Sequence, residues 1–146
     1  MSMNQSHNIG IIGTGAIAIK HAQAINSLAN AVLVGLFNPN PVSSEKAKGK
    51  FSAPVFSDWE EFISLPGLDI VCICTPSGMH LEPALNVIQA GKHVFVEKPI
   101  EVTLDRADQL IQAAEAKQVK LGVVFQNRFS SDFIQALKMA VKGYKD

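Results

Sequence analysis

A run of small residues near the start of the chain has the spacing that binds a pyrophosphate. The segment Gly13-Thr14-Gly15-Ala16-Ile17-Ala18 matches the pattern G-x-G-x-x-G/A and lies between an apolar run and a helix-like stretch. Gly13 permits a tight strand-to-helix turn, Gly15 leaves room for phosphate beside the backbone, and the small Ala18 lets the helix pack closely on the strand. The N-terminus of that helix offers free N–H groups and partial positive charge. We therefore expect dinucleotide contacts from Gly13, Thr14, Gly15, Ala16 and Ile17, the alternative being a merely structural turn.

The second candidate is Asn38, at the end of the next apolar run. In dinucleotide-binding folds an acidic residue at this place binds the ribose 2′-hydroxyl. An amide can also hydrogen-bond a hydroxyl, but it does not repel a 2′-phosphate. No arginine follows Asn38, although Lys46 and Lys48 are nearby. We expect NAD as the cofactor, with NADP left open. The structural alternative is that Asn38-Pro39 only forms a turn and does not contact a cofactor.

These residues need a sheet whose strands end near one another. Six short apolar runs predict buried strands at 8–13, 31–37, 55–56, 68–74, 93–96 and 119–125. Helix-like stretches lie at 16–29, 41–50, 79–90, 103–117 and 131–141, and a further helix begins at 58–61. Alternating buried strands and helices predict an α/β fold with a doubly wound parallel sheet, the Rossmann fold, with six strands in the order 3-2-1-4-5-6 and helices on both faces. Apolar spacing predicts one buried face from Ile17, Ala24, Ile25 and Leu28, and another from Leu104, Ala107, Leu110, Ile111 and Ala114.

The composition is that of one ordinary globular domain. The chain has 146 residues, 47% of them hydrophobic and 18% charged, and its 13 Lys+Arg balance its 13 Asp+Glu. A net charge of zero gives no broad attraction to a polyanion, so neither nucleic acid nor an acidic membrane is an expected partner.

Cys72 and Cys74 are interpreted as small buried hydrophobes, and we expect no disulfide and no metal site. Reduced cysteines and a polar segment Met1–Asn8 without a targeting pattern indicate a cytoplasmic protein.

The chain resembles the Gfo/Idh/MocA oxidoreductase family, which includes glucose–fructose oxidoreductase and inositol dehydrogenases. Besides the glycine-rich turn, the resemblance is carried in order by Thr75-Pro76-Ser77-Gly78-Met79-His80, by Ala90-Gly91-Lys92-His93-Val94-Phe95-Val96-Glu97-Lys98-Pro99, and by Gln126-Asn127-Arg128-Phe129. These matches extend over residues 9 to 129. Two departures are Asn38, where the family usually has Asp, and Ser77, where Asn is frequent.

The resemblance implies a nicotinamide-dependent oxidoreductase that acts on a sugar, a cyclitol or a related hydroxy or keto compound. It implies cofactor contacts from Thr75, Pro76, His80, Glu97, Lys98 and Arg128. Lys98 is the implied catalytic residue, because a lysine cation can hydrogen-bond the substrate oxygen and stabilise developing alkoxide charge. Glu97 could orient Lys98, and a cis Lys98–Pro99 bond is left open. The competing interpretations are a solvated lysine at Lys98, a structural hydrogen bond at His80 and a surface ion pair at Arg128.

The resemblance also predicts the domain organisation. Residues 1–129 would form the dinucleotide-binding domain, and residues 130–146 would form a helix leading toward a C-terminal substrate domain that the sequence lacks. Family members are about twice as long, and their second domain supplies an Asp and a His spaced D-x-x-x-H. We therefore expect this chain to be inactive alone, and the full-length protein to be a homo-oligomeric dehydrogenase with a small-molecule substrate. The alternative is a naturally short, non-catalytic module that binds or senses NAD(P)(H).

Overall fold

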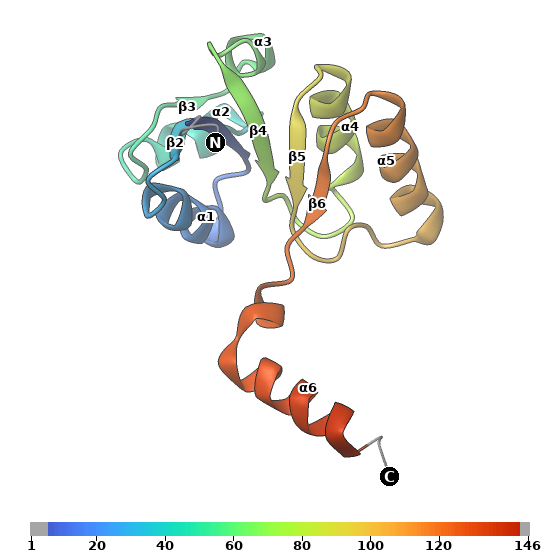
Figure 1. The fold of residues 1–146 in the computed structure, drawn as a ribbon. Helices are drawn as coiled ribbons and strands as arrows, with labels where there is room; N and C mark the ends of the chain where they lie inside the picture. Colours follow the sequence, from blue (N-terminus) through green and yellow to red (C-terminus); the bar gives the residue numbers. More distant parts are fainter. Residues whose placement is uncertain (1–5, 144–146) are drawn as a thin grey trace.

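The computed structural model describes residues 6–143 and contains one six-stranded parallel sheet (Figure 1). The strands are β1 (His7–Ile12), β2 (Ala31–Phe37), β3 (Val55–Phe56), β4 (Leu68–Ile73), β5 (His93–Val96) and β6 (Leu121–Val123). Their order, β3-β2-β1-β4-β5-β6, confirms the prediction. Because β1 pairs with β2 on one side and with β4 on the other, the direction of winding reverses there. Ligands of doubly wound folds bind at such a switch point, beyond the carboxyl ends of the strands.

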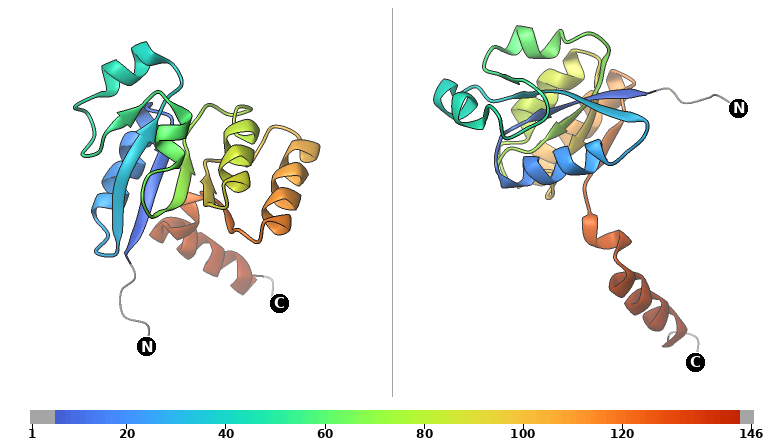
Figure 2. Two further views of the ribbon diagram at one scale, coloured as in Figure 1. Left: turned by 90° about the horizontal axis from the view of Figure 1, so that it is seen from above. Right: turned by 90° about the vertical axis from the view of Figure 1, so that its left-hand side faces the viewer.

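Helices cover both faces of the sheet (Figure 2). They are α1 (Ala16–Asn26), α2 (Pro41–Ala47), α3 (Trp59–Ile63), α4 (Leu81–Gln89), α5 (Leu104–Ala116) and α6 (Ser131–Gly143), with a 3-10 turn at Gln126–Phe129. One core packs α3, α4 and α5 against the sheet, around buried residues such as Phe62, Val71 and Leu110. The other core packs α1 against the opposite face, around Ile11, Ala18 and Leu36. The chain therefore has the predicted fold, built on two separate hydrophobic layers.

Local capping signals place several helix ends where the sequence indicated. Asp58 accepts a hydrogen bond from the Glu61 N–H and caps α3, and the Thr103 hydroxyl caps α5. Pro83 lies in the first turn of α4, where its missing N–H costs little. Gly91 follows α4 with a φ of +73°, which only glycine adopts without strain. The helix predicted over 16–29 is shorter, because α1 ends at Asn26.

The buried faces of α1 and α5 differ from the predicted ones. In α1 the buried residues are Ala18, Ala22 and Ile25, whereas Ile17 and Ala24 are exposed. Leu28, which follows the end of the helix, is exposed as well. Small alanines let α1 approach the sheet, and this stripe turns Ile17 sideways. In α5 the buried residues are Ala107, Leu110 and Ala114, while Leu104 is 82% exposed and Ile111 is also exposed. The predicted faces were wrong at these positions because apolar spacing alone does not show how far the sheet extends under a helix.

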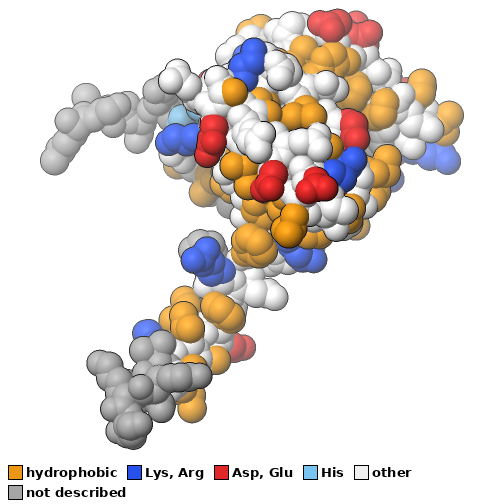
Figure 3. All heavy atoms as spheres, turned by 90° about the vertical axis from the view of Figure 1, so that its right-hand side faces the viewer, with side chains coloured by type: hydrophobic (Ala, Val, Ile, Leu, Met, Phe, Trp, Pro, Cys, Tyr) orange, Lys and Arg blue, Asp and Glu red, His pale blue; other side chains and the backbone are white. Residues whose placement is uncertain are grey.

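Helix α6 lies apart from the layered body, as Figures 1 and 3 show. Its exposed apolar side chains include Phe133, Ile134, Leu137 and Met139. These side chains form an exposed apolar surface on the helix that was predicted to lead toward a second domain. That such a domain covers this surface stays a prediction. Parts of both predicted units, residues 1–5 and 144–146, lie outside the described residues. Among the helices of residues 6–143, none has the length and apolarity needed to cross a membrane.

Candidate nucleotide-binding site

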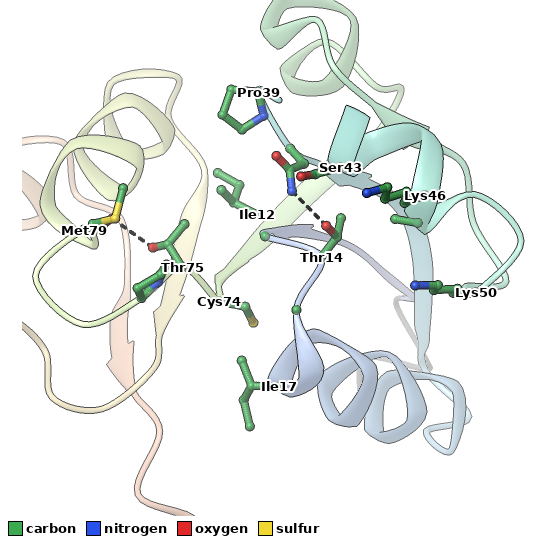
Figure 4. A pocket seen from close by; sticks show the side chains of 15 residues that line it. Ile12, Thr14, Ile17, Pro39, Ser43, Lys46, Lys50, Cys74, Thr75 and Met79 are labelled. Atoms are coloured by element: carbon green, nitrogen blue, oxygen red, sulfur yellow. Dashed lines mark hydrogen bonds between the residues drawn. The ribbon is translucent and has the colours of Figure 1, made fainter. Parts of the chain in front are cut away.

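A cleft of about 650 Å³ opens at the carboxyl ends of β1, β2 and β4 (Figure 4). Seven of the predicted cofactor residues line it: Gly13, Thr14, Gly15, Ile17, Asn38, Thr75 and Pro76. Ala16 opens α1 between them but does not line the cleft. The switch point of the sheet thus brings together three segments that lie far apart in the sequence. Ile17, which turns away from the core, contributes an apolar side chain to the cleft wall.

The glycine turn has the backbone that its sequence pattern predicts. Gly13 has a φ of +101°, and a Cβ there would stand 2.7 Å from the Cys74 carbonyl oxygen, so only glycine fits. A Cβ added at Gly15 meets nothing within 4 Å, which means that open space adjoins the backbone. Gly15 is the N-cap of α1 and supplies no capping side chain. The first N–H groups of α1 therefore have no intrahelical or capping partner, and this arrangement fits a pyrophosphate.

Asn38 joins the end of β2 to the glycine turn. Its side-chain N–H donates to Thr14 Oγ1 at 2.8 Å, and its Oδ1 accepts from the Asn40 N–H at 3.0 Å. The Ser44 hydroxyl donates to the Asn38 carbonyl at 2.8 Å, which holds the start of α2 against the same strand end. A neutral amide with both ends engaged thus stands where an acid would bind the ribose.

Two lysines enter the cleft from α2 and the residues after it. Lys46 and Lys50 both line it, together with Ser43 (Figure 4). Lys48, which the sequence also placed nearby, does not line the cleft and instead pairs with Glu45 at 2.6 Å. The sequence did not indicate Lys50, because its place depends on how the chain turns after α2.

His80 does not line the cleft. Its side chain is buried, with 1% of the residue exposed, and each ring nitrogen faces a backbone carbonyl oxygen. Nδ1 lies 2.9 Å from the oxygen of Pro99, and Nε2 lies 3.0 Å from that of Thr75. The ring therefore joins the loop after β4 to the loop after β5. This placement agrees with the alternative of a structural hydrogen bond, and the predicted cofactor contact stays a prediction.

A carboxylate that the sequence reasoning missed ties the same two loops together. Glu101 is buried and accepts hydrogen bonds from the N–H groups of His80 (3.1 Å), Leu81 (2.8 Å) and Val102 (2.9 Å). Arg106 donates its Nε–H to Glu101 at 3.0 Å and reaches the Gly78 carbonyl at 3.2 Å. Hydrogen bonds from Arg106 and from the backbone lower the pKa of Glu101 to about 2, against the opposing effect of burial.

Glu97 is also buried, and its partner comes from α1. Its Oε1 lies 2.7 Å from His21 Nε2, and its Oε2 accepts the Lys98 backbone N–H at 3.2 Å. Glu97 therefore does not line the cleft, and it holds the Lys98 backbone rather than the ammonium group. One sequence signal could have revealed His21: it lies in the buried stripe of Ala18, Ala22 and Ile25, where a polar side chain needs a partner.

Lys98 and Arg128 lie together in a second cavity. This space of about 420 Å³ is lined by Lys98, Phe125, Gln126, Asn127, Arg128 and Phe133. It lies beyond the ends of β5 and β6, next to the start of α6. The Lys98–Pro99 peptide bond is cis. The structure thus places most of the predicted residues either in a cleft with the glycine turn or in a cavity with the candidate catalytic cation, whereas Ala16, His80 and Glu97 line neither.

The two cysteines are free, buried and unsuited to nucleophilic chemistry. Burial raises the pKa of Cys72 to about 12 and that of Cys74 still further. Both thiols are therefore protonated near neutral pH. Their placement on the α1 side of β4 agrees with the interpretation as small core residues.

Comparison with known proteins agrees with this geometry. The model of the GFO_IDH_MocA oxidoreductase family, described as an NAD-binding Rossmann fold, matches residues 7–125. The chain is 32% identical over 137 residues to scyllo-inositol 2-dehydrogenase (NADP(+)) IolW of Bacillus subtilis, covering 92% of this chain and 37% of that protein. It is 36% identical over 137 residues to inositol 2-dehydrogenase of Agrobacterium fabrum, covering 91% of this chain and 40% of that protein.

A solved structure is similar over nearly the whole chain. The WlbA dehydrogenase of Bordetella pertussis, crystallised with NADH and UDP-GlcNAcA, superposes with a TM-score of 0.84 at 31% identity. The match covers 94% of this chain and 42% of that one. The chain thus spans about two fifths of the length of these relatives.

Proposed function

The chain belongs to the Gfo/Idh/MocA family of oxidoreductases with an NAD-binding Rossmann fold, and we propose that it is the cofactor domain of a dehydrogenase acting on a sugar or a cyclitol. The observation that carries the proposal is the open space at Gly15 beside the uncapped N-terminus of α1, at the switch point of the sheet. Two of the named relatives are inositol dehydrogenases, and the third is a dehydrogenase crystallised with UDP-GlcNAcA; these names support the substrate class.

Different residues of the cleft would bind different parts of the cofactor. Gly13 and Gly15 give the pyrophosphate access to the backbone, and the first N–H groups of α1 would donate to it. Thr14 and Asn38 stand where the adenosine ribose would bind, and Thr75 and Pro76 form the opposite wall. When bound, the nicotinamide group supplies or accepts the hydride.

Lys98 is the proposed catalytic residue, and its role is electrostatic. An ammonium group can hydrogen-bond the substrate oxygen and stabilise the negative charge that develops there. The Glu97 carboxylate fixes the Lys98 backbone, and Arg128 adds a second cation to the same cavity. Phe125 and Phe133 give that cavity apolar walls, although both side chains are exposed in this chain.

Three further features belong to the proposal. The exposed apolar side chains of α6 would pack on a second domain of the full-length protein, which would complete the substrate site. The full-length protein would be a homo-oligomer with a small-molecule substrate and no nucleic-acid partner. A cytoplasmic location is supported by the two free cysteines.

The test combines cofactor binding with a substrate screen in the full-length protein. Titration calorimetry should detect NAD⁺ or NADP⁺ binding that Gly15→Val abolishes, because the valine side chain would fill the space beside the backbone. Ala24→Val is the matched control, since Ala24 is exposed on α1 and does not line the cleft. Inositols and sugars are then screened by the absorbance of reduced cofactor. Cofactor binding that Gly15→Val leaves unchanged would contradict the assigned site, and binding without turnover of any polyol would favour the non-catalytic alternative.

A further inference from the structure

The adenosine end of the cleft carries positive charge and no negative charge. Its lining residues include Lys46 and Lys50, and none of them is an Asp or a Glu. The nearest acidic residue in the sequence, Glu45, is held by Lys48 at 2.6 Å and does not line the cleft. Within residues 6–143 neither Lys46 nor Lys50 takes part in an ion pair. Both ammonium groups are therefore available to a ligand at this end.

The two lysines approach the ribose position from one side. In Figure 4 both side chains extend from the α2 side toward the space in front of Thr14. Ser43 lies on the same wall and adds a hydroxyl group. Two ammonium groups and a hydroxyl donate hydrogen bonds and supply positive charge, which suits a phosphate better than a neutral diol.

Asn38 does not act against such a phosphate. A carboxylate at this place would accept hydrogen bonds from the ribose hydroxyls and repel an added phosphate. The Asn38 amide is uncharged, and its Oδ1 already accepts the Asn40 N–H at 3.0 Å. It therefore lacks the charge that excludes a 2′-phosphate, and one of the two acceptor sites of its Oδ1 is already used by the backbone.

We propose that Lys46 and Lys50, with the Ser43 hydroxyl, bind the 2′-phosphate of NADP(H), and that the cleft prefers NADP(H) to NAD(H). This inference rests on the proposed function. It reverses the preference expected from the sequence, which weighed the missing arginine and could not place Lys50 in the cleft. The adenosine 2′-phosphate is the only group by which the two cofactors differ, so the residues that surround it would decide the choice.

The experiment compares both cofactors in the full-length protein and its lysine variants. Calorimetric titration should give NADP⁺ a dissociation constant about tenfold lower than that of NAD⁺. The double variant Lys46→Gln with Lys50→Gln should weaken NADP⁺ binding about tenfold or more and change NAD⁺ binding by less than about twofold. Lys48→Gln is the matched control, because Lys48 lies between these lysines in sequence but outside the cleft, and it should change neither constant.

Two further measurements keep the outcome decisive. The probe 2′,5′-ADP should compete for the site better than 5′-AMP, and added salt should weaken NADP⁺ binding more than NAD⁺ binding, because salt screens exposed charge pairs. Tighter binding of NAD⁺ than NADP⁺, or equal losses for both cofactors in the double variant, would overturn the inference and leave the proposed function intact. Failure of both cofactors to bind the wild-type protein would contradict the proposed function itself, and this inference with it.

Discussion

The His21 ring on α1 and the Glu97 carboxylate after β5 are joined by a hydrogen bond of 2.7 Å between Nε2 and Oε1. Both side chains are largely buried, and 76 positions of sequence separate them. The bond links the helix whose N-terminus faces the cleft to the segment that carries Lys98. A polar contact on the α1 side of the sheet thus fixes the position of the glycine turn relative to the segment that carries the candidate catalytic lysine.

This contact should stabilise the fold measurably. His21→Ala leaves the buried Glu97 Oε1 without its partner, which should lower the free energy of unfolding by about 1–3 kcal/mol. His21→Gln keeps a side-chain donor and should recover part of the loss. His7→Ala is the control, because His7 is half exposed and its pairing with Asp69 is long, at 3.8 Å. Urea denaturation checks the series, and an equal cost at His7 and His21 would contradict the structural importance of the pair.

Glu101 gives the stability a defined pH dependence. Its pKa is about 2 in the folded chain and about 4.5 when unperturbed, so the unfolded state binds the proton more readily. The ionised carboxylate therefore stabilises the fold above about pH 4.5, and this contribution is lost as the pH falls toward about 2.

Glu101→Gln should remove that dependence. The variant should be less stable than the wild type near neutral pH, and the difference should shrink as the pH falls between about 4.5 and 2. Arg106→Met should be destabilising as well, because it leaves the buried carboxylate without its cation. Glu115→Gln, an exposed change on α5, serves as the control. Unfolding midpoints at several pH values decide the question, and parallel pH profiles of Glu101→Gln and wild type would refute the assignment.

The two cysteines should resist thiol reagents in the native state. Burial keeps both thiols protonated near neutral pH, and the reactive species is the thiolate. Alkylation by iodoacetamide should therefore be slow in buffer and fast in denaturant, where both thiols are exposed. The reagent consumed over time measures the protection. Rapid labelling of either cysteine without loss of structure would show that β4 and the residue after it are more open than the structure indicates.

The sequence predicted the sheet and the glycine turn because these features are encoded locally. Six apolar runs in alternation with helices predict a doubly wound parallel sheet, and the glycine-rich turn after the first strand favours the Rossmann order of its strands. The backbone requirement at Gly13 is visible in the motif itself. The buried faces of α1 and α5 were harder to predict, because exposure depends on where the sheet ends. Leu104 and Leu28 have the right type and spacing but lie past the surface that would cover them.

The polar contacts between distant segments were not predicted either. The fold brings together the partners of Glu101, Arg106 and His21. No local sequence pattern predicts which residues these partners are. The surroundings of His80 were not predicted for the same reason: its position at a helix start next to the cleft is visible in the sequence, but the two carbonyl groups that enclose its ring are not. Lys50 entered the cleft through the turn after α2, which apolar periodicity does not describe.

The last prediction separates chemistry from cofactor binding, in the full-length protein. Lys98 lies in the cavity beyond β5, whereas Gly15 lies in the cleft. A change at Lys98 should therefore impair turnover, and a change at Gly15 should impair cofactor binding. Lys98→Met keeps most of the stem and removes the charge. It should lower kcat by about 10²–10³, equivalent to about 3–4 kcal/mol of lost stabilisation of the alkoxide-like oxygen.

Cofactor affinity should hardly change in the same variant. The dissociation constant of Lys98→Met should stay within about threefold of the wild type, because the pyrophosphate and adenosine contacts lie elsewhere. Gly15→Val should instead abolish binding, since its side chain would occupy the phosphate space. Lys120→Met is the matched control, because Lys120 is an exposed lysine at the opposite end of β6. Steady-state kinetics and titration distinguish these cases. Turnover near the wild-type rate in Lys98→Met would make Lys98 a solvated surface lysine, and the charge on the substrate oxygen would then have to be stabilised by Arg128 or by the second domain.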